Sequence, residues 1–185
     1  MSKIYDEITS DLQQWISEQR LFFVATAPTG GEQGSDGHIN CSPKGLDSLR
    51  VLRPRTVAYL DLTGSGAETI AHLRENGRIC LMFCAFEGSP KIVRLHGHGE
   101  VITPADTDWQ QLVSHFPPHP TARSIIRITC ERISDSCGFG VPRFEYAGDR
   151  ETLSKLADQG ADAVTAYQQR HNLQSIDGLP ALDPQ

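Results

Sequence analysis

Strand-like segments that follow one another with short connections are the feature that most constrains the fold. Apolar stretches rich in β-branched and aromatic residues predict strands at Arg55–Leu62, Arg78–Phe86 and Lys91–Thr103. One short helical stretch, Ala67–Glu75, separates the first two, and a Glu-Gly-Ser-Pro turn separates the others. Parallel strands would need a crossover, usually a helix, between every pair. The spacing therefore predicts a mainly β (α+β) chain with an antiparallel barrel rather than repeated βαβ units.

Shorter segments extend this prediction toward both ends of the barrel. Strands are predicted at Leu21–Ala27, His38–Ser42 and Ile125–Ile133, and a Gly-rich loop over residues 28–37 joins the first two. Apolar residues recur at helical spacing near the N-terminus, which predicts an amphipathic helix over residues 3–19.

Further helices are expected after the long strand. Thr103 followed by proline predicts a helix start, and we expect that helix to run to about His115 with Trp109, Leu112 and Val113 facing inward. Two more helices are predicted near residues 149–158 and 161–171.

No linker or composition change divides the chain. We expect one domain over residues 1–185, with a core at about 20–135 and a C-terminal helical extension at about 145–175. A hydrophobic fraction of 38% and a charged fraction of 22% are ordinary for a folded chain.

The charge pattern excludes several classes of partner. The net charge is −6, and the basic residues form no cluster, so a nucleic-acid partner is not expected. No apolar run approaches the roughly 20 residues of a membrane span, and the acidic, amphipathic start is unlike a secretory signal. We therefore expect no membrane partner and a cytoplasmic location.

The cysteines fit a reducing compartment. Five cysteines with no C-x-x-C spacing suggest neither a disulfide framework nor a zinc site. Cys41, Cys80, Cys84 and Cys130 lie in apolar strand contexts and are expected in the core. Cys137 lies in a Gly-flanked loop, where its thiol is either an exposed reactive group or simply part of a tight turn.

Two polar corners suggest a site for an anion. The Thr63-Gly64-Ser65-Gly66 turn leads directly into a helix, whose N-terminal N–H groups favour an anion. Ser65 and Glu68 have capping-box spacing, so a plain capped turn is the alternative interpretation. The Asn40–Lys44 segment follows a strand and adds a hydroxyl and a cation, although an isolated lysine is more often simply solvated.

Together these segments resemble the pyridoxamine 5′-phosphate oxidase-like family of FMN-binding split β-barrels. The resemblance covers Phe22–Val101 and rests on the strand before Lys44, the block VAYLDLTGSGAETIAHLRENGRICLMF and the alternating strand after it. It implies an antiparallel split β-barrel, FMN as cofactor and a homodimer with flavin at the subunit interface.

The resemblance also implies which residues bind the cofactor. The residues implied to contact the flavin or its phosphate are Asn40, Ser42, Lys44, Tyr59, Leu60, Gly64, Ser65, Gly66 and Lys91. True pyridoxamine phosphate oxidases carry adjacent Arg and Lys residues in the phosphate turn, where this chain has Ser65-Gly66. The phosphate charge must then be met by backbone N–H groups and a cation from elsewhere, for which Lys44, Arg78 and Lys91 are candidates. The Trp and Arg cluster near the family's C-terminus has no clear match either.

One further pattern concerns metals. His96, His98 and Glu100 alternate along one strand and so share a face, which suits either a metal half-site or a polar outer surface. A haem-ligand role for either histidine is a third alternative. We favour the polar surface and predict no metal.

These observations predict a flavoprotein, with oxidoreductase activity on an unidentified small molecule. FMN supplies the redox chemistry in such enzymes, so no catalytic acid or base is assigned. NADH or NADPH is a candidate electron donor. The alternative is a non-catalytic flavin- or haem-binding carrier on the same fold.

Overall fold

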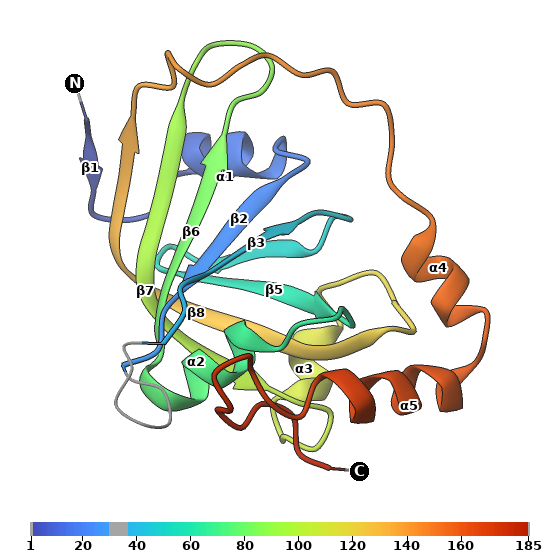
Figure 1. Ribbon diagram of the computed structural model, residues 1–185. Helices are drawn as coiled ribbons and strands as arrows, with labels where there is room; N and C mark the ends of the chain where they lie inside the picture. The colour runs from blue at the N-terminus through green and yellow to red at the C-terminus, as the bar shows by residue number, and fades with distance from the viewer. Residues whose placement is uncertain (1, 30–36, 185) are drawn as a thin grey trace.

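Figure 1 shows the architecture in a computed structural model that describes residues 2–29 and 37–184. The strands are β1 (Ile4–Tyr5), β2 (Phe22–Thr26), β3 (Asn40–Lys44), β4 (Leu49–Arg53), β5 (Thr56–Leu62), β6 (Arg78–Cys84), β7 (Ile92–Ile102) and β8 (Ala122–Ser136). The helices are α1 (Ser10–Ser17), α2 (Glu68–Asn76), α3 (Trp109–Val113), α4 (Thr152–Ala157) and α5 (Ala161–His171). Within the described residues the strands form one 8-stranded antiparallel sheet in the order β3-β2-β6-β7-β8-β5-β4, and β1 pairs with β8.

The sheet curls into a barrel that is split between β3 and β5. Four strands separate β3 from β5 in the sheet order, yet Nζ of Lys44 on β3 lies 2.8 Å from Oδ1 of Asp61 on β5. The two strands meet through side chains rather than through a backbone ladder. The predicted antiparallel split barrel is confirmed.

Aliphatic and aromatic side chains fill the barrel. Strand residues alternate between faces, and the inward set includes Val24, Leu81 and Leu95, which are fully buried. Each such side chain contributes roughly 1.5–3 kcal/mol relative to an exposed position. Helix α1 packs Leu12 and Ile16 into the same core.

The N-terminal helix is shorter than predicted. Strand β1 and a turn replace its first part, because the β1 backbone pairs with the end of β8. Oγ1 of Thr9 accepts the N–H of Leu12 at 3.3 Å, which caps α1 and sets its start at Ser10. The helical spacing of apolar residues extends past the helix because Ile8, which precedes it, also packs into the core.

Two strands differ from the prediction. Sequence analysis does not predict β4, whose two arginines interrupt an apolar pattern, but β4 pairs with β5 across a short Pro-Arg connection. Strand β8 extends beyond the predicted residues 125–133 at both ends, because β5 pairs with it from Ala122 and β7 pairs with it as far as Ser136.

The helix predicted from Thr103 begins later. The N–H and hydroxyl of Thr103 both donate to Oδ2 of Asp106, at 2.6 and 2.8 Å, and this local turn precedes the helix. Helix α3 then starts at Trp109, and Trp109 and Leu112 are buried as predicted.

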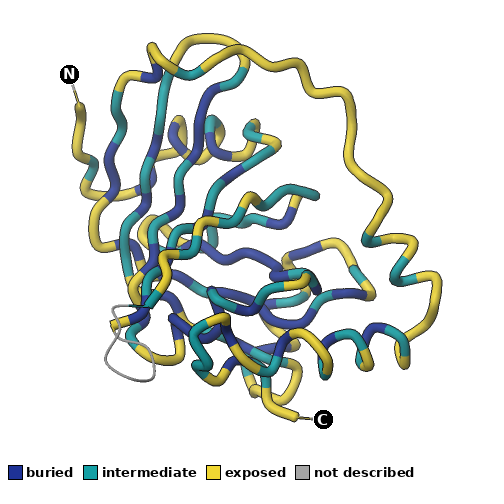
Figure 2. Tube along the Cα trace, in the orientation of Figure 1, coloured by how far each residue is buried: buried dark blue, intermediate teal, exposed yellow. Residues whose placement is uncertain are grey.

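An arm, two helices and a tail follow the barrel. We call residues 139–151 the arm; they form neither helix nor strand and run outside the barrel from β8 to α4 (Figure 1). Figure 2 shows the arm exposed along nearly all of its length, and Phe139 and Phe144 are 83% and 60% exposed. We call residues 172–184 the tail, which lies against α2 (Figure 1) and buries Ala181 beside Ile70.

The core prediction for Cys41 is wrong. Alternate residues of β3 face opposite sides, and Cys41 is on the exposed side. Cys84 and Cys130 are buried as predicted, Cys80 is half-buried and Cys137 is exposed.

Two further predictions concern the Gly-rich loop and membrane-spanning segments. The Gly-rich loop over residues 28–37 lies largely outside the described residues. Among the helices of the described chain, none has the length and apolar character needed to cross a bilayer.

Candidate functional site

The turn between β5 and α2 presents a run of free backbone N–H groups. Thr63 anchors its start, because its N–H and its hydroxyl both donate to the carbonyl oxygen of Thr121, each at 2.8 Å. In the part of the chain that the structure describes, the N–H groups of residues 64–67 have no hydrogen-bond acceptor. Helix α2 begins immediately afterwards, and helix N-termini carry a partial positive charge. The turn can therefore donate several hydrogen bonds to one anion.

The predicted capping box between Ser65 and Glu68 does not form. Ala67 precedes α2 and no side chain caps the helix, because Glu68 is the first helical residue rather than the third. Ser65 is exposed, and the Glu68 carboxylate instead fills the space where a Cβ on Gly66 would lie. The space around Gly64 is open.

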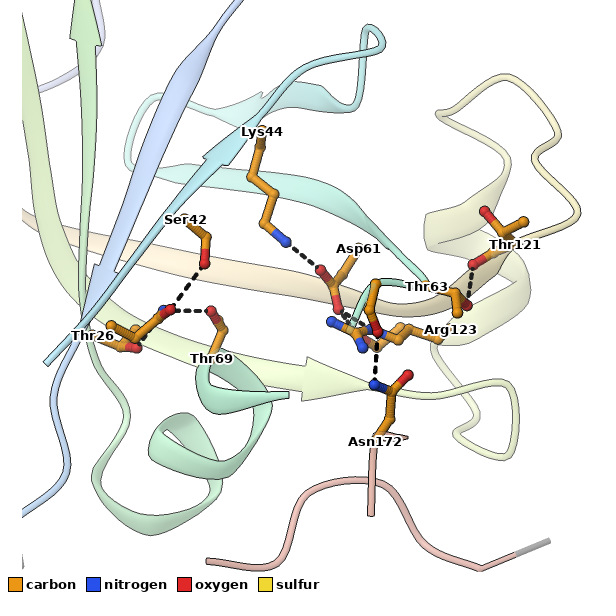
Figure 3. Close-up of polar contacts among 12 residues, drawn as sticks. Thr26, Ser42, Lys44, Asp61, Thr63, Thr69, Thr121, Arg123 and Asn172 are labelled. Atoms are coloured by element: carbon orange, nitrogen blue, oxygen red, sulfur yellow. Dashed lines mark hydrogen bonds and ion pairs between the residues drawn. The ribbon is translucent and has the colours of Figure 1, made fainter. Parts of the chain in front are cut away.

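A buried ion cluster joins β3, β5 and β8 beside this turn (Figure 3). Asp61 is fully buried; its Oδ1 lies 2.8 Å from Nζ of Lys44 and its Oδ2 lies 2.7 Å from Nε of Arg123. The Ser124 hydroxyl donates to the same Oδ2 at 3.3 Å. Burial alone would raise the pKa of Asp61, but the charges of Lys44 and Arg123 outweigh it and lower that pKa to about 2. Two cations thus share one carboxylate, which leaves an excess positive charge.

A β-bulge explains why Arg123 reaches Asp61. Ser124 pairs with Asp61 and Ala122 pairs with Leu62, so Arg123 has no partner residue on β5. A bulge places on one side of the sheet two residues that would otherwise face opposite sides. Nη1 of Arg123 is buried and has no hydrogen-bond partner among the described residues. Sequence analysis misses Arg123, because a register shift leaves no local signal in the sequence.

A second polar network runs from β3 toward α2. Nδ2 of Asn40 donates to Oγ1 of Thr26 and of Thr69, at 3.1 and 3.0 Å, and the Ser42 hydroxyl donates to Oδ1 of Asn40 at 2.9 Å. Oγ1 of Thr26 also lies 2.9 Å from Nδ1 of His72, which is fully buried. Burial lowers the pKa of His72, so its ring is neutral at neutral pH. This network fixes the orientations of the Asn40 and Ser42 side chains.

Tyr59 and Leu60 direct their side chains into the core. Tyr59 is fully buried and its ring meets that of Phe22 edge-on at 5.6 Å, while Leu60 packs in the cluster around Trp109. Burial raises the pKa of Tyr59 well above its usual range. Nζ of Lys44 lies 5.8 Å from the centre of the Tyr59 ring. Tyr59 therefore borders the ion cluster from within the barrel, whereas Leu60 faces the opposite side of the sheet.

Arg78 and Lys91 stand apart from this cluster. The Arg78 guanidinium reaches the carbonyl oxygens of Ala27 and Pro28, at 3.4 and 3.3 Å. Nζ of Lys91 lies 4.9 Å from the ring centre of Trp15. The structure therefore brings together Asn40–Lys44 and the turn but not Arg78 or Lys91.

Lys91 belongs to a groove between the arm and the barrel. This aromatic groove has a volume of about 1370 Å³, and its walls include Trp15, Phe86, Phe144 and Cys137. The Phe144 N–H donates to the carbonyl oxygen of Phe86 at 3.1 Å, and the two rings lie 5.5 Å apart. None of the residues of the Asp61 cluster or of the turn contributes to the walls.

His96, His98 and Glu100 of β7 do not converge on one point. Oε2 of Glu100 accepts two hydrogen bonds from Arg127, and the His98 ring lies against Gly77. Nδ1 of His96 is buried without a partner among the described residues. Over residues 2–29 and 37–184, no group of three or more His, Cys, Asp or Glu side chains is arranged to hold a metal ion.

The chain is an antiparallel split barrel in which a turn with unbonded backbone N–H groups precedes a helix. The family described as "Pyridoxamine 5′-phosphate oxidase" matches residues 8–137. The "Pyridoxamine 5′-phosphate oxidase family protein ustO" of Aspergillus flavus is 40% identical over 200 residues, covering 98% of this chain and 78% of the relative. The chain belongs to the pyridoxamine 5′-phosphate oxidase family.

Solved structures agree on the fold. HupZ of Group A Streptococcus superimposes with a TM-score of 0.51 at 24% identity, covering 68% of this chain and 91% of HupZ. A protein of Lactobacillus delbrueckii gives a TM-score of 0.52 at 20% identity, covering 71% of this chain and 98% of that protein. At these identities the similarity shows the architecture alone.

Proposed function

We propose that this protein is an FMN-dependent oxidoreductase that acts on a small molecule. The observation that carries the proposal is the run of free N–H groups over residues 64–67, which lies beside two cations that share one carboxylate. On a chain of the pyridoxamine 5′-phosphate oxidase family, this arrangement suits the phosphate of a flavin mononucleotide.

The residues present fit a phosphate. Its oxygens would accept hydrogen bonds from the backbone N–H groups of the turn, and the excess positive charge of the Lys44–Asp61–Arg123 cluster would balance part of its charge. The free Nη1 of Arg123 adds a buried donor with no other partner among the described residues. These donors would replace the two cations that true pyridoxamine phosphate oxidases carry where this chain has Ser65-Gly66. For this reason we propose flavin chemistry without proposing pyridoxamine phosphate as the substrate.

The Asn40 network would orient the other part of the cofactor. When bound, FMN supplies hydride-transfer chemistry, so the protein has to bind, orient and shield rather than provide a nucleophile. Ser42 donates its hydroxyl proton to Asn40, which leaves its oxygen lone pairs free to accept a hydrogen bond from a ligand N–H. Asn40 is held by two threonines and cannot rotate without losing those bonds.

We also infer a homodimer. Lys91 lines the aromatic groove, whereas Lys44 belongs to the Asp61 cluster, and the two lysines do not meet within one chain. If both contact one flavin, we infer that they come from different protomers. The exposed aromatic residues of the arm border the same groove and offer an apolar surface for a partner subunit.

A spectrum of the purified protein tests the cofactor assignment. A yellow preparation, or a colourless one that becomes yellow after incubation with FMN, should absorb near about 450 nm, a property of the flavin itself. Bleaching by NADH or NADPH followed by recovery in air would support the oxidoreductase. A flavoprotein that neither donor reduces would indicate a carrier, and a protein that takes up no FMN would refute the proposal.

A further inference from the structure

The end of α5 and the tail pack directly onto the proposed phosphate turn. Nε2 of Gln168 donates to Oγ1 of Thr63 at 2.8 Å, and Nδ2 of Asn172 donates to the carbonyl oxygen of Gly64 at 2.8 Å. Figure 3 shows Asn172 reaching the site from the side opposite Lys44. Gln168 and Asn172 are both buried. Two side chains from the C-terminal extension therefore hold the first two residues of the turn.

The bond from Asn172 sets the direction of a neighbouring N–H group. The peptide between Gly64 and Ser65 is planar and trans, so its C=O and N–H point in opposite directions. Because the carbonyl oxygen of Gly64 points to Asn172, the N–H of Ser65 must point away from it. That N–H has no acceptor among the described residues.

Asn172 is itself held firmly in place. Its N–H donates to the carbonyl oxygen of Gln168 at 2.8 Å, and its carbonyl oxygen accepts the N–H of Leu182 at 3.0 Å. The tail is fixed to α2 by Ala181, which is buried beside Ile70. The other amide atom of Asn172, Oδ1, is buried without a partner in the described chain. The donor to Gly64 is thus the one side-chain hydrogen bond that this buried amide makes.

We propose that Asn172 is a positioning residue for the phosphate of FMN. Its amide locks the Gly64–Ser65 peptide so that the Ser65 N–H faces the ligand, and this inference rests on the proposed function. A preorganised donor does not have to reorient when the anion binds, so losing the lock weakens phosphate binding more than flavin-ring binding.

The test compares FMN with riboflavin, which lacks the phosphate. Asn172→Ala removes the donor, and Asn172→Leu removes it while keeping the branch at Cγ. Asp183→Asn is the matched control, because Asp183 lies in the same tail but pairs with Arg74 on α2 and does not contact the turn. Kd values for both flavins are measured by fluorescence quenching in each variant, after urea unfolding has shown that the variant is folded.

We expect Asn172→Ala and Asn172→Leu to weaken FMN about tenfold and riboflavin less than about twofold, with no change in Asp183→Asn. Equal losses for the two flavins, or no loss, would overturn the inference and leave the proposed function standing. A loss of FMN selectivity in Asp183→Asn would also overturn it, because a loosened tail would then explain the effect. Wild-type protein that binds neither flavin would overturn the proposed function, and this inference with it.

Discussion

The two ends of the barrel are built in contrasting ways. At the end that we propose binds the phosphate, called the phosphate end below, Asp61 is fully buried between two cations, and the tail closes over the turn through Asn172. At the other end, a wide aromatic groove lies beneath an arm whose Phe144 is 60% exposed. Polar side chains are buried in a network of ion pairs and hydrogen bonds at one end, and apolar side chains are left in contact with solvent at the other.

We infer from this difference which part of the proposed site a single chain completes. A buried ion cluster is costly to form unless its geometry is already correct, so the phosphate end is preorganised within one protomer. Exposed aromatic residues gain stability from association, so the groove is the end that a partner would complete. The following predictions test that division.

The largest expected effect is on folding at the phosphate end. Asp61→Asn would leave Lys44 and Arg123 without their shared counter-charge, and we expect it to reduce the free energy of unfolding by about 3–5 kcal/mol. Urea unfolding followed by circular dichroism measures the change. Glu145→Gln, on the exposed arm, should change stability by less than about 0.5 kcal/mol. Equal effects of the two substitutions would refute the contrast between the ends.

A smaller effect is expected on cofactor binding. Lys44→Ala removes a charge-assisted contact and should weaken FMN by about 1.5–3 kcal/mol, or one to two decades in Kd, with riboflavin affected much less. The control is Lys155→Ala, whose lysine lies on the exposed helix α4 and pairs with Glu151 just before it; this variant should bind both flavins normally. If Lys44→Ala weakened both flavins equally, Lys44 would contact the ring or only support the fold.

The same cluster predicts an acid-sensitive contribution to stability. The folded-state pKa of Asp61, about 2, lies below its ordinary value of 3.8. The contribution is therefore complete above about pH 4 and is lost as the pH falls toward 2, amounting to about 2 kcal/mol. Urea unfolding of wild-type and Asp61→Asn proteins between pH 6 and pH 2, as test conditions, should show their stability difference shrinking with acid by about this amount. A constant difference would mean that Asp61 does not titrate in this range.

Substitution of Glu68 is expected to strengthen FMN binding, whereas Lys44→Ala weakens it. The Glu68 carboxylate lies against Gly66 at the start of α2, where its negative charge would repel an anion bound by the turn. Glu68→Gln should tighten FMN by about 0.3–1 kcal/mol, roughly two- to fivefold. Asp11→Asn makes the same charge change at the start of α1 and should leave FMN affinity unchanged. Weaker FMN binding in Glu68→Gln would mean that the carboxylate supports the turn instead.

The smallest effect on folding is expected in the groove. Phe144→Ala removes a largely exposed ring and should lower the stability of the isolated protomer by no more than about 1 kcal/mol. Its main consequence should be weaker self-association, measured by analytical ultracentrifugation over a range of concentrations. A variant that dimerises like the wild type would show that Phe144 is not at the interface.

Local patterns in the sequence were enough to predict the barrel and the turn. The alternation in Lys91–Thr103 reports which residues face the core, and it survives as β7 because β8 pairs along its whole length and β6 pairs with it from Ile92 to His98. The glycines of the turn are equally local signals. Cys41 could also have been placed correctly, because the alternation that puts Ser42 beside the site requires Cys41 to face the other side.

The rest of the site depends on contacts that no local pattern encodes. Arg123 points inward only because one residue of β8 is unpaired, and in an ordinary register it would face away from Asp61. The capping box failed because α2 starts at Glu68, which the Ser65 spacing does not determine. Asn172 reaches Gly64 through the path of the arm and helices, which only the folded chain defines.

The bond from Asn172 to Gly64 also has a consequence for the order in which the protein matures. It spans 108 positions in the chain, and β8, the last strand, ends at Ser136. A chain emerging from the ribosome can therefore pair every strand before the residue that fixes the turn has left the exit tunnel. A product interrupted between these two points would keep its sheet and lack a fixed phosphate cradle. On the proposed function, such a product would bind FMN more weakly than a chain that extends past residue 172.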